Sequence, residues 1–154
     1  MLDNRFAPLA MDPLHLLVRW AHVAGMAAIL GGALLVWWLA ARRPPFEDRV
    51  TTRVAEGSEW IFWAAIGLQV MTGVGNLGAF GNALPPPESA WGIKLTVKLV
   101  AVLLLALISV PRTLAVAARS EADTLPRLSL PLLYGGTTVF VIGILGLAVW
   151  LANG

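Results

Sequence analysis

Residues 14–41 read LHLLVRWAHVAGMAAILGGALLVWWLAA, an apolar stretch long enough to cross a lipid bilayer. About 20 apolar residues in a helix span the hydrocarbon layer, so this stretch predicts a transmembrane helix. It also contains His15, Arg19 and His22, and these two histidines are the only ones in the chain. Ionisable groups inside a membrane helix are costly, so these three residues are candidates for a functional role.

Two histidines and two methionines share one stripe of this predicted helix. At about 100° per residue, the four side chains fall within about 60° of one another; they are Met11, His15, His22 and Met26. Arg19 follows His15 by four residues and lies close to the stripe. Imidazole and thioether groups bind soft metals, and a histidine on a membrane helix can be an axial ligand of haem. The alternative is that the histidines are hydrogen-bonded and the methionines fill the core.

The composition predicts one integral membrane domain covering residues 1–154, because 58% of the residues are hydrophobic and only 13% are charged. The net charge is only +2, and no basic cluster interleaves with aromatic residues, so nucleic acid is not an expected partner. The chain has no cysteine, which excludes disulfides and thiolate metal sites.

Four apolar runs predict an all-α fold, a four-transmembrane-helix bundle embedded in the lipid bilayer. The predicted helices cover about residues 14–41, 57–77, 91–111 and 128–151. Glu59 falls in the approach to the second run, and Arg112 in the loop after the third. Gln69 is the one amide in the second run, and a helix–helix hydrogen bond is its expected role.

The arginines predict the orientation in the membrane. The first and third loops contain seven of them, Arg42, Arg43, Arg49, Arg53, Arg112, Arg119 and Arg127, whereas the second loop has no basic residue. The positive-inside rule therefore predicts that these two loops are cytoplasmic and that both termini are outside. His22 and Lys98 would then both lie about 12 Å deep in the outer half, with Lys94 nearer the surface. No acidic residue lies at that depth, so Lys98 must snorkel, lose its proton or meet an anionic ligand.

Several short motifs resemble the CopD-type copper-resistance membrane domain. His22 followed by Gly31-Gly32 is similar to the H-x6-W-x-G-G pattern of that family's first helix, although Ile29 replaces the tryptophan. Thr72-Gly73 resembles the T-G of the family's second helix. Residues 91–98, WGIKLTVK, resemble its aromatic-G-x-x-L-x-x-K entry to the third helix, with the leucine and the lysine of the pattern at Leu95 and Lys98. A basic residue, Arg112, follows that helix as it often does in the family, so the likeness spans about residues 14–112.

This resemblance implies a multi-pass protein of the bacterial inner membrane that handles copper delivered from the periplasm. A periplasmic copper chaperone or a respiratory complex would then be a partner, and a homo-oligomer stays open. The first-helix pattern also resembles the HemJ-type membrane protoporphyrinogen oxidase, which binds haem through a first-helix histidine. The later motifs of that enzyme are not evident in this chain.

The copper hypothesis predicts two Cu(I) stations on the first helix. Met11 with His15, and His22 with Met26, are i,i+4 pairs, and each pair can bind one ion. The two histidines are about 10.5 Å apart along the axis, which is too far for one shared metal. Met71 joins the set if the second helix packs alongside.

The alternative cofactor is haem b, with Arg19, Lys94 and Lys98 paired to its propionates. Both histidines lie on one face of one helix, so Met71, an open position or a partner subunit must complete the axial ligation. A third hypothesis is a structural subunit of a larger membrane complex.

Catalysis by side chains alone is not expected, because the sequence offers no buried carboxylate pair and no nucleophile beside a histidine. Tyr134 is expected to anchor the fourth helix at the membrane interface. Ser109, Thr137 and Thr138 are expected to bond their own helix backbone.

Overall fold

The computed structural model describes residues 13–42, 48–78, 86, 88–121 and 129–153. These residues form four α-helices: α1 (Pro13–Arg42), α2 (Asp48–Gly78), α3 (Ala90–Glu121) and α4 (Ser129–Asn153). The structure is therefore all-helical over its described part, as the four apolar runs predict. Met11, one of the predicted metal ligands, lies outside the described residues.

Within the described residues, three stretches of helix are long and apolar enough to cross a membrane. They are Pro13–Arg42, Gly92–Ala118 and Leu130–Trp150, with mean hydropathy of 2.0, 2.4 and 2.1. Many large apolar side chains on them are exposed, such as Trp20 at 68% and Leu103 at 58%. Lipid is the solvent that suits such a surface, so the chain is a membrane protein. The described part of α2 is not among these stretches.

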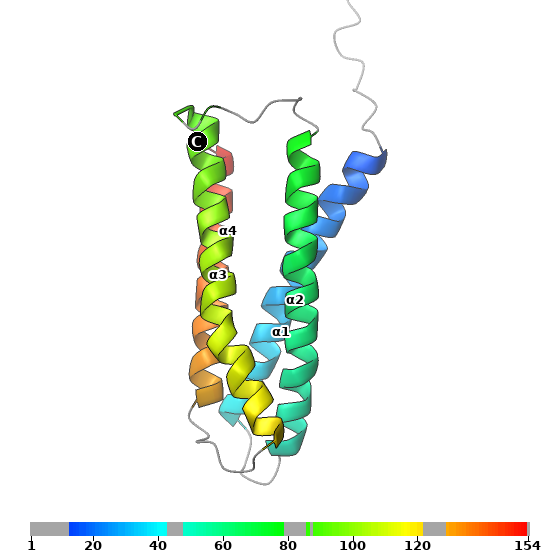
Figure 1. Ribbon diagram of the computed structural model, residues 1–154, viewed down its shortest axis with the longest axis vertical. Coiled ribbons are helices and arrows are strands. Elements are labelled where there is room, and N and C mark those ends of the chain that lie inside the picture. Colours follow the sequence, from blue (N-terminus) through cyan, green and yellow to red (C-terminus); the bar gives the residue numbers. More distant parts are fainter. Residues whose placement is uncertain (1–12, 43–47, 79–85, 87, 122–128, 154) are drawn as a thin grey trace, which may run out of the picture.

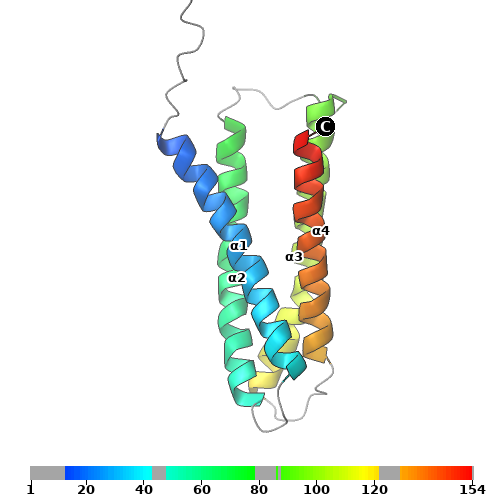
Figure 2. The ribbon, with the colours of Figure 1, turned by 180° about the vertical axis from the view of Figure 1, so that it is seen from behind.

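Each helix packs against two others. α1 contacts α2 and α4, and α3 contacts α4 and α2, whereas no close approach joins α1 to α3 in the described chain. α1 crosses α2 obliquely, so that its first half lies away from α3 and α4 and its last half approaches α4 (Figures 1 and 2). We call the end where α1 and α3 begin the histidine end, and the opposite end, where α2 and α4 begin, the arginine end.

Two helices are longer than the apolar runs predict. α2 begins at Asp48 rather than near residue 57, and α3 continues ten residues beyond Pro111, to Glu121. Proline removes one backbone hydrogen bond, and membrane helices tolerate it because neighbouring groups satisfy the freed carbonyl. Arg112 therefore lies within α3 and is 1% exposed, so its predicted place in a loop is wrong.

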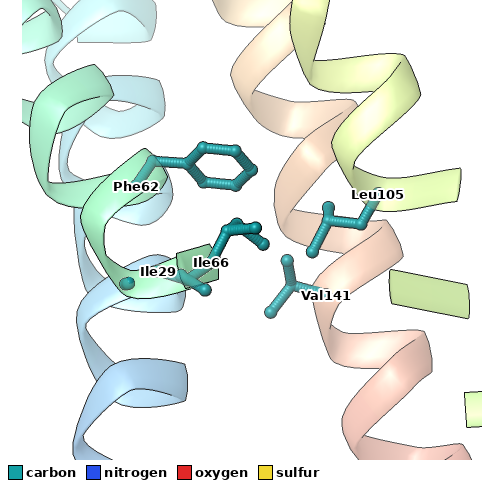
Figure 3. Packing of buried hydrophobic residues seen from close by; sticks show 6 residues of the cluster. Ile29, Phe62, Ile66, Leu105 and Val141 are labelled. Carbon is teal, nitrogen blue, oxygen red and sulfur yellow. The ribbon is translucent and has the colours of Figure 1, made fainter. Parts of the chain in front are cut away.

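Two apolar clusters hold the helices together. The histidine-end core consists of Ile29, Phe62, Ala65, Ile66, Leu105 and Val141, and Figure 3 shows its members meeting between the α1–α2 and α3–α4 pairs. The arginine-end core consists of Ala33, Val36, Ala55, Val116, Leu130 and Tyr134. Buried polar residues of α2, α3 and α4 lie between the two cores along the helices, and they include Glu59 and Arg112.

Candidate functional site

The ring of His22 is oriented by the hydroxyl of Thr72. Thr72 Oγ1 donates to the carbonyl of Leu68 at 2.6 Å, and His22 Nδ1 lies 2.8 Å from the same Oγ1. Because the single hydroxyl hydrogen is used on the carbonyl, the hydroxyl accepts from Nδ1–H of the ring. The other nitrogen, Nε2, is then left with its lone pair. A histidine that donates through one nitrogen and offers the other is the arrangement found at metal ligands.

A second hydrogen bond joins α2 to the backbone of His22. Gln69, which is 5% exposed, donates from Nε2 to the carbonyl of His22 at 2.6 Å. Gly25 makes this approach possible, because a Cβ atom at that position would lie 2.6 Å from the Gln69 amide nitrogen. The helix–helix hydrogen bond predicted for Gln69 is confirmed, and its partner is the candidate ligand residue itself.

Four of the predicted metal ligands, His15, His22, Met26 and Met71, lie within the described residues, and their surroundings differ. Met26, one turn after His22, packs against the histidine-end core. His15 lies two turns before His22 on α1 and is partly buried. Met71 is 75% exposed, so α2 presents Thr72 and Gln69 to α1 and turns Met71 outward.

The predicted cationic residues also lie at the histidine end. Arg19 and Lys98 are exposed, whereas Lys94 is partly buried and has an interaction partner. Lys98 lies within electrostatic range of the His22 ring, although the backbones of α1 and α3 do not approach each other closely in the described residues.

The donor set at His22 fits a soft metal or an axial ligand better than a hard cation. Within the described residues, no three His, Asp or Glu side chains gather closely enough to hold a metal ion. The ligand group that the structure makes available here is the Nε2 nitrogen of His22, and imidazole nitrogen suits copper and iron better than Mg²⁺ or Ca²⁺, which prefer oxygen ligands.

The most extensive polar cluster was not predicted. Arg112 of α3 donates to both carboxylate oxygens of Glu59 on α2, from Nε at 2.7 Å and from a terminal nitrogen at 3.1 Å. Tyr134 of α4 and Thr113 of α3 donate to the same carboxylate at 2.5 and 2.6 Å. Glu59 thus accepts four hydrogen bonds while only 5% exposed.

The guanidinium of Arg112 is enclosed as fully as the carboxylate. It lies 4.3 Å from the ring centre of Phe62 and 4.9 Å from that of Tyr134. A terminal nitrogen donates to Thr137 Oγ1 at 3.0 Å. Trp63 extends the cluster by donating to Thr113 Oγ1 at 3.0 Å. We call Glu59, Arg112, Thr113, Tyr134 and Thr137 the ion-pair cluster.

Several sequence-based roles change because of this cluster. Tyr134 is 1% exposed and bonded to Glu59, so the prediction of an interface anchor is wrong. Ser109 and Thr137 bond the carbonyls of Leu105 and Leu133, as predicted. The hydroxyl of Thr138 is buried without a hydrogen-bond partner among the described residues, so its predicted backbone bond is absent.

One signal in the sequence could have indicated the cluster. Glu59 begins the aromatic run EWIFW, and Arg112 directly follows the apolar run that ends at Pro111. A single acid and a single base next to long apolar runs can neutralise each other inside a membrane. With Glu59 placed in the approach to the second run and Arg112 in the third loop, that pairing is not predicted.

No family model, no curated protein and no solved structure matches this chain. The likeness to the CopD-type domain therefore stays a prediction drawn from the motifs quoted above.

Proposed function

We propose that this chain is a copper-binding protein of the bacterial inner membrane, similar to the CopD type, which binds Cu(I) at His22 for copper uptake or handling. The observation that supports this most is the Thr72 hydroxyl, which engages Nδ1 of His22 and leaves Nε2 available. Met26 supplies a thioether one turn away on the same helix. The proposal includes a second station at His15, for which Met11, four residues earlier in the sequence, would supply a thioether.

The proposed arrangement is a bundle in which α2 also crosses the membrane and both termini are outside. α2 has 31 residues and packs against the spanning helix α1, so it is long enough to cross. Arg42, Arg49 and Arg53 lie at the arginine end, which is then cytoplasmic. His15 and His22 then lie in the periplasmic half, where copper would arrive.

Haem b is the second candidate ligand, because Lys98 lies within electrostatic range of His22. A positive charge there opposes a bare cation and favours a ligand with carboxylates, such as haem propionates. Haem would supply redox chemistry when bound, and His22 Nε2 is the group that would hold its iron. The second axial position would be open or filled by a partner subunit, because Met71 faces outward.

A Cu(I) competition titration against a chromogenic chelator, under anaerobic conditions, tests the copper proposal. Purified protein is compared with His22→Ala and with His15→Ala, since both are partly buried histidines of α1 and each substitution removes one proposed station. We expect each substitution to abolish Cu(I) binding at its own station and to retain binding at the other. Equal Cu(I) binding in all three proteins would contradict the assignment. A Soret band that shifts in His22→Ala would instead support haem.

A further inference from the structure

We propose that the outer face of α1 at the arginine end binds one anionic phospholipid, whose phosphate pairs with Arg42. An open groove of about 580 Å³ lies on this face. The described residues that line it are Leu34, Leu35, Trp37, Trp38, Ala41 and Arg42. Leu34 lies twelve residues after His22, which is about 18 Å of helix, so the groove is separate from the proposed copper site. The inference needs only that the chain is a membrane protein.

One wall of the groove, Trp37, is held in place by α4. A Cβ atom at Gly135 would lie 3.0 Å from Trp37 Nε1 and 3.3 Å from its Cδ1, so the indole packs closely against the α4 backbone. Figure 2 shows the last turns of α1 beside the start of α4. Trp37 is nevertheless 42% exposed, and the part of the ring that α4 leaves uncovered lines the groove. The apolar surface is therefore supported by two helices.

Trp38 holds the guanidinium of Arg42 at the end of the groove. The Cζ atom of Arg42 lies 5.5 Å from the centre of the Trp38 ring, and the two residues are four positions apart on α1. Within the described residues Arg42 has no carboxylate partner, whereas Arg112 is paired with Glu59. A guanidinium stacked on an aromatic ring keeps its N–H groups available for the oxygens of a phosphate. Arg42 is therefore a positioned cation that can pair with an external anion.

The length of the groove matches one leaflet of a bilayer. From Leu34 to Arg42 is eight residues, about 12 Å along the helix, and half of the hydrocarbon layer is about 15 Å thick. Arg42 is the last residue of α1, and Trp37 and Trp38 lie just inside it, at the depth of an aromatic belt. A phosphate at Arg42 would place an acyl chain along the exposed side chains of Leu34 and Leu35.

The charge of this end favours an anionic headgroup over a zwitterionic one. Residues 42–53 contain four arginines and two acidic residues, and Arg49 and Arg53 are exposed, as Arg42 is. Basic pockets beside membrane helices bind the headgroups of anionic lipids. A partner helix is a less suitable occupant, because helix contacts in membranes use small residues, whereas bulky tryptophan and leucine side chains line this groove.

Native mass spectrometry of the protein released from detergent micelles tests the proposal. Phosphatidylglycerol, which is anionic, is titrated against phosphatidylcholine with the same acyl chains. Arg42→Gln is compared with the matched control Arg53→Gln, which removes the same charge from an exposed arginine that does not line the groove. We expect one phosphatidylglycerol to bind in preference to phosphatidylcholine, and to bind about fivefold more weakly to Arg42→Gln. Arg53→Gln should keep the affinity of the native protein.

Two results of this titration would overturn the proposal. One is equal affinity for the two lipids in the native protein, or an equal loss in the two variants, because the charge would then act without a defined site. The other is a lipid-free dimer that dissociates in Trp38→Ala, because a second copy of the chain would then cover the groove.

Quenching in lipid vesicles gives a second arm that keeps every native arginine, and the absence of native cysteine makes the labelling specific. A fluorescent maleimide on Gly31→Cys lies one turn before Leu35 on the same face of α1, where a Cβ atom meets nothing within 4 Å. A label on Leu114→Cys, which is 63% exposed on α3, is the control. Phosphatidylglycerol with brominated chains should quench the Gly31→Cys label more strongly than brominated phosphatidylcholine does, and the Leu114→Cys label equally. Equal quenching of the Gly31→Cys label by both lipids would contradict the proposed site.

Discussion

At the scale of single residues, the hydroxyl of Thr72 determines what His22 can do. It is 7% exposed and bonded to the carbonyl of Leu68, so it has only lone pairs to offer the imidazole. A valine at this position has nearly the same shape but cannot accept a hydrogen bond. The ring would then be free to rotate or to change its tautomer.

We therefore predict that Thr72→Val weakens ligand binding at His22 by about 10-fold or more, as loss of such supporting groups does at known metal sites. Thr96→Val is the matched control, because Thr96 is exposed and bonds only its own helix, at the carbonyl of Gly92. The chelator competition measures both variants. Equal losses in the two would show that the Thr72 hydroxyl has no special role.

Two glycines of α1 permit a second paired comparison. Gly25→Ala would place a Cβ atom 2.6 Å from the Gln69 amide nitrogen, whereas Gly31→Ala meets nothing within 4 Å. Gln69 would have to withdraw from the His22 carbonyl, leaving buried polar groups without partners. We expect the free energy of unfolding of Gly25→Ala to be about 1–2 kcal/mol below that of Gly31→Ala. Titrated unfolding in mixed micelles gives both values, and equal stabilities would contradict the expectation.

At the scale of the helices, the apolar runs predict that four helices exist and roughly where they lie. They do not predict the extents of α2 and α3, because hydropathy treats Glu59 and Arg112 as reasons to end a span. The two charges are separated by 53 positions in the sequence and neutralise each other only after α2 and α3 pack. His22 and Gln69 could be selected from the sequence as unusual residues. The hydrogen bond between them forms only because α1 crosses α2 at this point. The periodicity of apolar residues within one helix does not predict where two helices cross.

The ion-pair cluster connects α2, α3 and α4. Removing one of its two charges should lower the free energy of unfolding more than removing both. Glu59→Ala leaves Arg112 buried without a counter-ion, and removing one partner of a buried pair costs about 3–5 kcal/mol. The double variant Glu59→Met with Arg112→Met removes both charges and retains apolar volume. We expect it to be markedly more stable than Glu59→Ala, as measured by the same unfolding titration. A double variant as unstable as Glu59→Ala would indicate that the hydrogen bonds, and not the unpaired charge, dominate.

At the scale of the whole molecule, the orientation in the membrane decides from which side of the membrane a ligand reaches His22. Glu88→Cys and Arg49→Cys place single labels at exposed positions near opposite ends. In bacterial spheroplasts, a membrane-impermeant maleimide should label Glu88→Cys at once and Arg49→Cys only after permeabilisation. The reverse pattern would place the histidine end in the cytoplasm and require a cytoplasmic source for the ligand of His22.

The pairing of Glu59 with Arg112 also bears on how the chain enters the bilayer during synthesis. A lone acid or arginine near the middle of a helix adds about 2.5–3.5 kcal/mol to insertion through the translocon. α2 meets this cost early, before its partner has been made, and over its described residues it is not among the apolar spans. If α2 crosses the membrane as proposed, it would wait at the translocon until α3 emerges, and the two would leave together with Glu59 and Arg112 paired. A ribosome-bound chain that ends before Arg112 should leave α2 outside the lipid.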